Sequence, residues 1–521
     1  MIMERNVFTR RSLVAGLGAL GAAGICASAV RNAHAACVPD AWDEEADVVV
    51  VGFGGAGVAA ACSAAEAGAR VLVLEKMSED LAGGDTSCNS GYVGPAQDVS
   101  TYIANSGYSM SEEQAQSLAA DVDAACVWVR QTEGVTFPDG SPIVDGGAEA
   151  LYAAIRNRAV DSGVRVIYET AAIELVQNPE TGEVLGVLAR RPDGSMLCVK
   201  AACGVVLASG DYGASQEIMG ALHYPGLPNV SVCTPAATGD ALVMGARAGA
   251  KIAHVDNLCI DWAGLALRKA SEAIGTGVLY NYAGVGEGAS NSASKLFVNY
   301  RGERFMNEEA VIAHMRSTAS LPMLAVEGNT GDSHKGFVNL PAFMVMDQSC
   351  FEAEPLVGNT GTGWRIKKHI YEWSEDNVAE LEMGWIMKAD SLEDLAALMT
   401  VPDYASGEEL AVPADALAAT VTAYNEGCAS GQDAYGRTNF QPLGDGPFYA
   451  VELVPCVMYT IGGLVGDADC RVLDWSDEPI PRLYRAGNVG HGTEYSPIGV
   501  SGCIGQGLHA GSSVAALTPQ A

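Results

Sequence analysis

The sequence is poor in positive charge, and its cysteines form no closely spaced pairs. Only 30 lysines and arginines stand against 63 aspartates and glutamates, which gives a formal net charge of −33 at pH 7. Such a chain repels nucleic acid and anionic membrane surfaces, so neither is an expected partner, and the charge can serve simply to keep the protein soluble. None of the 14 cysteines forms a C-x-x-C pair. This absence excludes haem-attachment, zinc-ribbon and iron–sulfur motifs, so we expect no metal site; disulfide pairing stays open.

An apolar run follows a pair of arginines near the N-terminus. The stretch Thr9-Arg10-Arg11-Ser12-Leu13-Val14 leads into LVAGLGALGAAGICASAV, and Ala33-His34-Ala35 follows. This pattern predicts a twin-arginine signal peptide over residues 1–35, so we expect export to the periplasm or the cell surface. The run is rich in glycine and alanine, which argues against stable membrane insertion. A lipoprotein cysteine at Cys37 is the alternative, although His34 suits that motif poorly.

The most informative stretch is DVVVVGFGGAGVAAACSAAEAGARVLVLEK, residues 47–76. It predicts a buried parallel strand over 48–51, a small-residue helix over 58–67 and a second strand over 70–74. Between the first strand and the helix, Gly52, Gly54 and Gly57 have the spacing G-x-G-x-x-G. These glycines permit a tight turn, close approach of the backbone to a pyrophosphate, and close packing of helix on strand. Glu75 ends the second strand, where a carboxylate can accept hydrogen bonds from ribose hydroxyls, so the stretch predicts a dinucleotide site.

Three further turns rich in small residues extend the predicted site. Gly83-Gly84-Asp85-Thr86-Ser87 follows soon after Glu75, and its backbone N–H groups can bind a pyrophosphate. Apolar strands also run into such turns at residues 205–211 and 483–489. A chain of 521 residues is too long for one simple core, so we expect two domains.

Taken together, these motifs resemble the flavoprotein family of fumarate reductase flavoprotein subunits and 3-ketosteroid dehydrogenases. The family's T-G-D-G helix start, G-x-R-F-x-N-E motif, P-F-Y-A-V-E stretch and T-x-G-G turn resemble residues 237–240, 302–308, 447–452 and 460–463. The resemblance implies an α/β fold: a discontinuous Rossmann-like FAD-binding domain, residues 46–235 and 459–517, with an inserted α+β cap, the catalytic domain, at 236–458.

FAD is the cofactor that the resemblance implies. The residues expected to bind it are Gly52, Gly54, Gly57, Glu75, Lys76, Gly83, Gly84, Asp85, Thr86, Ser87, Ile173, Ser209, Gly210, Asp240, Gly487, Asn488 and Ser501.

The chain departs from the family at the residues that hold dicarboxylates. Two histidines and two arginines clamp the substrate carboxylates in those relatives, because a site without water must replace their hydration with charged donors. The matching positions here are the Asp261-Trp262 step, Ile312, Met458 and the stretch 490–503, which holds no arginine or lysine. Gly288 and Asn291 fall near the places of the proton-relaying residues. The resemblance therefore implies that the substrate is not a short dicarboxylate.

One part of the last stretch resembles the 3-ketosteroid dehydrogenases instead. Tyr495 and Gly499 have the spacing Y-x-x-x-G of the tyrosine and backbone N–H that hold the substrate's ketone in those enzymes. Two donors on a carbonyl oxygen polarise an enone for hydride transfer. The alternative, that Tyr495 is an ordinary half-buried aromatic, stays open.

The acid or base is not fixed by the sequence. Ile312 stands where the 3-ketosteroid dehydrogenases carry a catalytic tyrosine, so another group must act. His314 and Arg316 follow closely and are our candidates, since a histidine titrates near neutral pH. Tyr280, Tyr282 and Tyr459 are alternatives, and each of these residues can equally be structural.

The FAD motifs and the missing dicarboxylate clamp together favour an exported FAD-dependent oxidoreductase that acts on CH–CH bonds. We expect it to reduce an activated C=C bond of an apolar, aromatic or enone substrate. Because the chain carries no haem motif, the electrons should come from an external donor, a cytochrome or quinol-linked carrier. Two alternatives stay open: a 3-ketosteroid dehydrogenase working in the desaturating direction, and a catalytically degenerate flavin electron-transfer or binding subunit.

Overall fold

Two units of the chain each build their own sheet, and each is described by itself. A computed structural model describes residues 38–106, 109–222, 230–231, 234–255, 258–274, 278, 294–308, 338–353, 355–357, 371–402, 409–490 and 499–520. Unit 1 comprises residues 1–221, 236–256 and 460–521; unit 2 comprises 222–235 and 257–459. The predicted signal peptide lies outside the described residues. The predicted domain bounds at 46–235, 236–458 and 459–517 stay a prediction.

Unit 1 contains an eight-stranded sheet whose main path runs β17-β18-β6-β1-β2-β3. The strands β18, β6, β1, β2 and β3 are parallel, while β17, β5 and β4 join by antiparallel pairing. The strands of the unit are β1 (Glu44–Val51), β2 (Val71–Leu74), β3 (Arg165–Ile167), β4 (Ala171–Gln177), β5 (Val184–Arg190), β6 (Met196–Leu207), β8 (Ile252–Ala253), β16 (Gly463–Leu464), β17 (Arg471–Leu473) and β18 (Pro479–Arg485). Its helices are α2 (Gly55–Glu66), η1 (Gly84–Ser87), α3 (Val99–Asn105), α4 (Glu112–Arg130), α5 (Gly147–Asp161), α6 (Gln216–Leu222), α7 (Asp240–Arg247), η4 (Gly487–Val489) and α14 (Gly499–Ala515).

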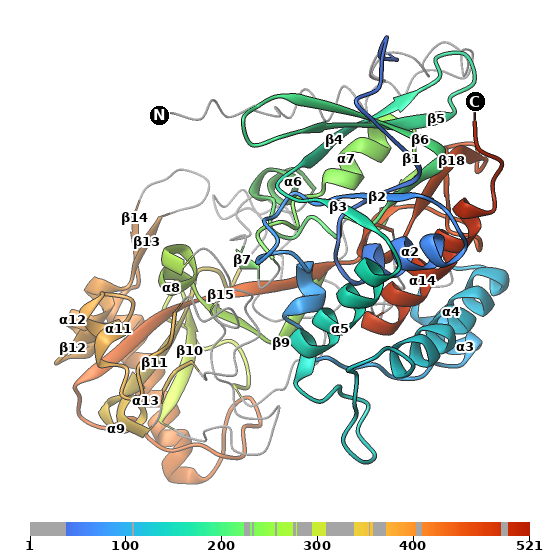
Figure 1. Cartoon of the computed structure of the whole chain (residues 1–521). Coiled ribbons are helices and arrows are strands. Elements are labelled where there is room, and N and C mark those ends of the chain that lie inside the picture. Colours follow the sequence, from blue (N-terminus) through green and yellow to red (C-terminus); the bar gives the residue numbers. More distant parts are fainter. Residues whose placement is uncertain are drawn as a thin grey trace. The chain divides into compact units, whose positions relative to one another are not determined.

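Helices α2 and α14 lie side by side in unit 1 (Figure 1). Small residues make this close approach possible. A Cβ atom at Gly507 would lie 2.3 Å from the carbonyl oxygen of Ala56, and one at Gly511 would lie 2.2 Å from that of Ala60. Both helices share a core with the strand residues Val48 and Val50, which are fully buried. The carboxyl end of β1 is thereby held against the first turn of α2, which positions the glycine turn between them.

Unit 2 contains a six-stranded sheet built around β15 (Phe448–Thr460). Its path is β10-β11-β15-β12, and β7 and β9 also pair with β15. The other elements of the unit are β7 (Val230–Ser231), β9 (Leu258–Leu267), α8 (Arg268–Ile274), β10 (Lys295–Asn299), β11 (Ala342–Asp347), α9 (Gln348–Ala353), α11 (Val378–Glu382), β12 (Met387–Ala389), α12 (Leu392–Leu398), β13 (Thr400–Pro402), β14 (Glu409–Ala411) and α13 (Ala414–Ser430).

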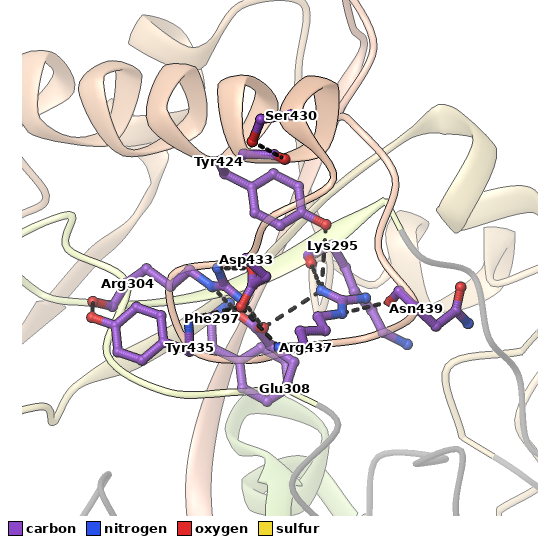
Figure 2. A network of polar contacts seen from close by, with 11 residues as sticks. Lys295, Phe297, Arg304, Glu308, Tyr424, Ser430, Asp433, Tyr435, Arg437 and Asn439 are labelled. Atoms are coloured by element: carbon purple, nitrogen blue, oxygen red, sulfur yellow. Dashed lines mark hydrogen bonds and ion pairs between the residues drawn. The ribbon is translucent and has the colours of Figure 1, made fainter.

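A buried ion-pair network links the G-x-R-F-x-N-E motif to the segment after α13 (Figure 2). Arg304 Nε donates to Glu308 Oε1 at 2.7 Å, and the guanidinium also forms an ion pair with Asp433. Arg437 Nη1 lies 3.5 Å from Glu308 Oε2 and donates to the carbonyl oxygen of Lys295 at 2.6 Å. The side chains of Arg304 and Glu308 are only 7% and 1% exposed. The network therefore fastens two segments that lie far apart in the sequence.

The ten cysteines whose side chains the structure describes are all free, and six of them are buried. Among the described helices, none combines the length and the apolar character that a membrane span requires.

Candidate functional site

The predicted glycine turn lies between β1 and α2, at the carboxyl end of the parallel strand. Gly52 has φ +96°, a conformation that favours glycine, and a Cβ there would lie 2.6 Å from the carbonyl oxygen of Ala208. A Cβ at Gly57 would lie 2.0 Å from the carbonyl oxygen of Gly52. Gly54 is the N-cap of α2 and offers no side-chain cap to the helix. The first turn of α2 can therefore present its N–H groups to a phosphate.

Glu75 follows β2 and closes the turn from the neighbouring strand. Its Oε2 accepts a hydrogen bond from the backbone N–H of Phe53 at 2.8 Å, and its Oε1 accepts one from Met77 at 2.7 Å. Burial raises the pKa of Glu75, and the two backbone donors oppose that shift by stabilising the charged form. The carboxylate is thus fixed in place beside the turn, where it can also accept from ribose hydroxyls.

Lys76 and Asp240 are two predicted cofactor residues that pair with each other. Lys76 Nζ lies 2.7 Å from Asp240 Oδ2 and donates to Thr238 Oγ1 at 2.6 Å. The helix α7 begins at Asp240, as the T-G-D-G pattern predicts, after Gly239 with φ +76°. The ion pair holds this helix start to the segment that follows β2.

The second glycine turn, Gly83 to Ser87, lies against the first. A Cβ at Gly84 would lie 3.8 Å from the Cα atom of Gly54, and Thr86 Oγ1 accepts a hydrogen bond from the N–H of Gly55 at 3.0 Å. Asp85 lies between Gly84 and Thr86 in η1. The hydroxyl of Ser87 donates to the carbonyl oxygen of Gly84 at 3.0 Å. The two turns predicted to bind the pyrophosphate are therefore brought together.

The turns after β6 and β18 flank the same glycine turn. The Cα atom of Ser209 lies 2.8 Å from the Cβ position of Gly52, and Gly210 follows with φ +77°. A Cβ at Gly487 would lie 2.9 Å from the Cβ of Ala56. Four of the predicted turns thus converge on the first turn of α2.

Three further predicted cofactor residues are Asn488, Ser501 and Ile173. The first two have side-chain contacts within the protein, and Ile173 lies outside the four turns. Asn488 Oδ1 lies 3.7 Å from the thiol of Cys503. Ser501 donates to the carbonyl oxygen of Gly94 at 3.0 Å. Ile173 lies in β4, where the pairing with β5 is irregular.

The catalytic predictions fall mostly on residues that the structure does not describe. Tyr495, His314 and Arg316 are among them, as are Tyr280, Tyr282 and Ile312. Gly499 is described: it begins α14 with φ +63°, and no atom of the described residues lies within 4 Å of its Cβ position. Tyr459 is buried at the end of β15, beside Met458.

Three residues of this region were not predicted from the sequence. Gln506 Oε1 accepts a hydrogen bond from the N–H of Gly487 at 3.1 Å, which fixes the turn after β18. Asp211 is buried directly after the Ser209-Gly210 turn, and Cys503 is half-buried with its sulfur 3.6 Å from the Cβ position of Gly487. Of these three residues, the sequence could have pointed only to Asp211. A carboxylate directly after the Ser209-Gly210 step is unusual in a turn that is expected to lie buried.

The described residues fit an FAD. Glycines stand where a Cβ would meet backbone, α2 points its N-terminus at the turns, and Glu75 is fixed as an acceptor. The turns at Gly54 and Gly84 would hold the pyrophosphate, and Glu75 the ribose.

Comparison with protein families agrees with this geometry. A family described as "FAD binding domain" matches residues 138–497, and one described as "FAD dependent oxidoreductase" matches residues 47–211. The chain belongs to the FAD-binding-domain family. The predictions of an FAD cofactor and of an FAD-dependent oxidoreductase acting on CH–CH bonds are confirmed.

Several characterised relatives match most of the chain. It is 27% identical over 501 residues to a vinyl phenol reductase of Lactiplantibacillus plantarum, covering 89% of this chain and 94% of that protein. A digoxin reductase of Eggerthella lenta is 26% identical, covering 99% and 98%. A fumarate reductase (cytochrome) of Shewanella frigidimarina is 27% identical, covering 88% and 74%.

Solved structures show the same fold at lower identity. A 3-ketosteroid Δ1-dehydrogenase from Sterolibacterium denitrificans matches with a TM-score of 0.61 and 19% identity, over 91% of this chain and all of that one. The open conformation of a flavocytochrome c3 fumarate reductase matches with a TM-score of 0.60 and 21% identity, over 91% and 78%. The predicted α/β fold with a Rossmann-like FAD-binding sheet is confirmed.

Proposed function

We propose that the enzyme reduces an activated C=C bond of a substrate that is not a dicarboxylate: an apolar, aromatic or enone compound. Met458 carries this proposal. It packs on an apolar cluster in unit 2 formed by Val230, Ala266, Val454 and Cys456. The family resemblance gives this position to a histidine that holds a substrate carboxylate. A thioether has no N–H to donate, and a carboxylate buried without charged donors is strongly disfavoured.

The sequence and the relatives support the same conclusion. Ile312 and the stretch 490–503 offer no arginine for a second carboxylate. Two relatives that match most of the chain are named for the reduction of vinyl phenol and of digoxin. The fumarate reductase is similar to the same degree, so overall identity does not separate the substrates, and the residues at the clamp positions must do so.

Bound FAD supplies the hydride that this reaction requires. We assign Tyr495 and the N–H of Gly499 to the substrate oxygen, where the two donors would stabilise the negative charge that develops as hydride reaches the β-carbon. Gly499 opens α14, and a helix N-terminus favours negative charge. His314 or Arg316 would deliver the proton to the neighbouring carbon.

The route of the electrons and the location of the protein are part of the proposal. The twin-arginine pattern at Arg10 and Arg11 supports export of the folded, FAD-loaded protein to the periplasm or cell surface. Electrons would then come from a cytochrome or quinol-linked carrier.

The test is anaerobic reoxidation of the reduced, FAD-loaded protein, followed at the flavin absorbance band. The acceptors are 4-vinylphenol, a hydroxycinnamate, a 3-keto-4-ene steroid and fumarate. We expect reoxidation by at least one of the first three, and loss of it in Tyr495→Phe for a carbonyl-bearing acceptor. Reoxidation by fumarate alone would contradict the proposal. Reduction of the oxidised enzyme by a saturated steroid would support the desaturating alternative, and no reaction with any acceptor would support a degenerate subunit.

A further inference from the structure

The turn after β6, residues 211–214, is hydrogen-bonded to chain segments that lead into and out of unit 2. The chain passes between the two units after residues 221, 235, 256 and 459. Unit 1 residues beside the last three of these passages bond to the turn. The turn directly follows Ser209-Gly210, two residues expected to bind FAD. It therefore joins a segment of the FAD site to the passages.

Asp211 holds the passage at which the chain returns from unit 2. Its side chain is only 1% exposed, and its Oδ2 accepts a hydrogen bond from the N–H of Thr460 at 2.6 Å. Thr460 is the first residue after that passage. The other oxygen, Oδ1, accepts from the N–H of Gly213 at 3.1 Å. One buried carboxylate thus shapes its own turn and fixes the start of the T-x-G-G motif.

Tyr212 and Ala214 bond to the two other passages. The hydroxyl of Tyr212, a residue that is 1% exposed, donates to the carbonyl oxygen of Val255 at 2.7 Å. The backbone N–H of Tyr212 lies 3.4 Å from Thr460 Oγ1. Ala214 donates its N–H to the carbonyl oxygen of Ala237 at 2.9 Å. Side chain and backbone of one short turn thereby reach three segments that lie far apart in the sequence.

Two of these segments also pack on each other and on a second FAD-binding turn. The strands β8 and β16 are antiparallel, with Gly463 opposite Ala253. A Cβ at Gly462 would lie 2.1 Å from the carbonyl oxygen of His254, which has φ +54° although it is not a glycine. A Cβ at Gly463 would lie 2.2 Å from the carbonyl oxygen of Val489, the last residue of η4. Movement of either segment would therefore disturb the turn after β18.

A ligand that orders one segment also orders the segments that are bonded to it. FAD bound at Ser209-Gly210 would restrict the turn that follows directly. We propose that Asp211 and Tyr212 are positioning residues that couple FAD binding to the order of the passages into unit 2. Because such coupling is reciprocal, ordered passages also strengthen FAD binding. The inference concerns cofactor occupancy and does not depend on which substrate the enzyme reduces.

The experiment is amide hydrogen exchange of the full chain, measured by mass spectrometry with and without FAD. In the wild type we expect FAD to slow exchange at least about tenfold in residues 252–255 and 460–464, as well as in the glycine turn 52–57. In Asp211→Ala the effect of FAD should be lost at 460–464 and kept at 52–57. In Tyr212→Phe it should be lost at 252–255 instead.

The matched control is Tyr435→Phe. The hydroxyl of Tyr435 also donates to a carbonyl oxygen at 2.7 Å, that of Arg304, but it belongs to unit 2 and the residue is 43% exposed. Its loss should leave the effect of FAD at 252–255 and 460–464 unaltered.

Three outcomes overturn the proposal. The first is a wild type in which FAD does not slow exchange at 252–255 and 460–464. The second is an equal effect of FAD in the wild type and in both variants. The third is faster exchange by the same factor with and without FAD, which is the result of a merely structural role. Should Asp211→Ala fail to retain FAD, Tyr212→Phe decides the test alone by the same criteria.

Discussion

The carboxylate of Glu75 accepts a hydrogen bond from the backbone N–H of Phe53 at 2.8 Å, which ties the end of β2 to the glycine turn after β1. The same side chain is the predicted acceptor for the FAD ribose. One residue therefore shapes the glycine turn and is also expected to bind the cofactor. Changes at Glu75 should consequently affect both the local fold and FAD affinity.

Glu75→Gln should weaken FAD binding roughly ten- to a hundredfold, because a neutral amide accepts more weakly than a carboxylate and has only one acceptor oxygen. Titration of the apoprotein with FAD by flavin fluorescence measures the dissociation constant. Glu79→Gln is the matched control, since Glu79 is 62% exposed and forms a surface ion pair with Arg156. Equal affinities for the two variants would contradict the role given to Glu75.

Gly57→Ala should yield protein that lacks FAD. Its Cβ would lie 2.0 Å from the carbonyl oxygen of Gly52, so the turn must move away from α2. The ratio of flavin to protein after purification measures the effect. Gly220→Ala places the same methyl group in α6, where no atom of the part of the chain that the structure describes lies within 4 Å, and should load FAD normally. A fully loaded Gly57→Ala protein would show that the close approach of turn and helix is not required.

Arg304→Met should destabilise unit 2 by about 3–5 kcal/mol, because it leaves Asp433 buried without its cation and leaves Glu308 with the longer 3.5 Å contact to Arg437. Arg301→Met, at the residue just before the motif, provides the comparison. Arg301 pairs with Glu303 at 3.0 Å, but the two side chains are 41% and 59% exposed, so its loss should cost less than about 1 kcal/mol. Urea unfolding of both variants measures the difference, and similar losses would contradict the importance given to burial.

His509 and Asp121 should stabilise unit 1 in a pH-dependent way. The hydrogen bond that His509 Nδ1 donates to Asp121 Oδ1 at 3.0 Å raises the pKa of His509, so the stabilisation is full below the unfolded pKa of histidine and is lost as pH rises through the folded value. Asp121→Asn should therefore lower stability by roughly 0.5–1 kcal/mol at low pH and by less at high pH. Thermal unfolding at about pH 6 and about pH 9 tests this. A loss that is equal at both pH values would mean that the pair contributes no charge interaction.

Much of the FAD site could be predicted because its signals are local. The β-branched run of β1, the glycine spacing and Glu75 all lie within 30 residues, where strand, turn and helix chemistry decides the structure. The start of α7 at Asp240 was predicted from four adjacent residues.

The contacts that sequence reasoning missed join distant segments. Asp211 meets Thr460 across 249 positions, and Arg304 meets Asp433 across 129. No local periodicity reports such pairs, because they depend on how strands and turns assemble. Tyr495, His314 and Arg316 lie outside the described residues, so their catalytic roles stay predictions.

The most direct measurement is the ratio of second-order rate constants for reoxidation of the reduced enzyme by an unsaturated arene or enone and by fumarate. The missing cationic clamp predicts that the better of the neutral acceptors is faster by at least about a hundredfold, since a buried carboxylate without charged donors loses several kcal/mol of binding. A ratio that favours fumarate would contradict the interpretation that Met458 and the stretch 490–503 lack the donors needed to hold a dicarboxylate.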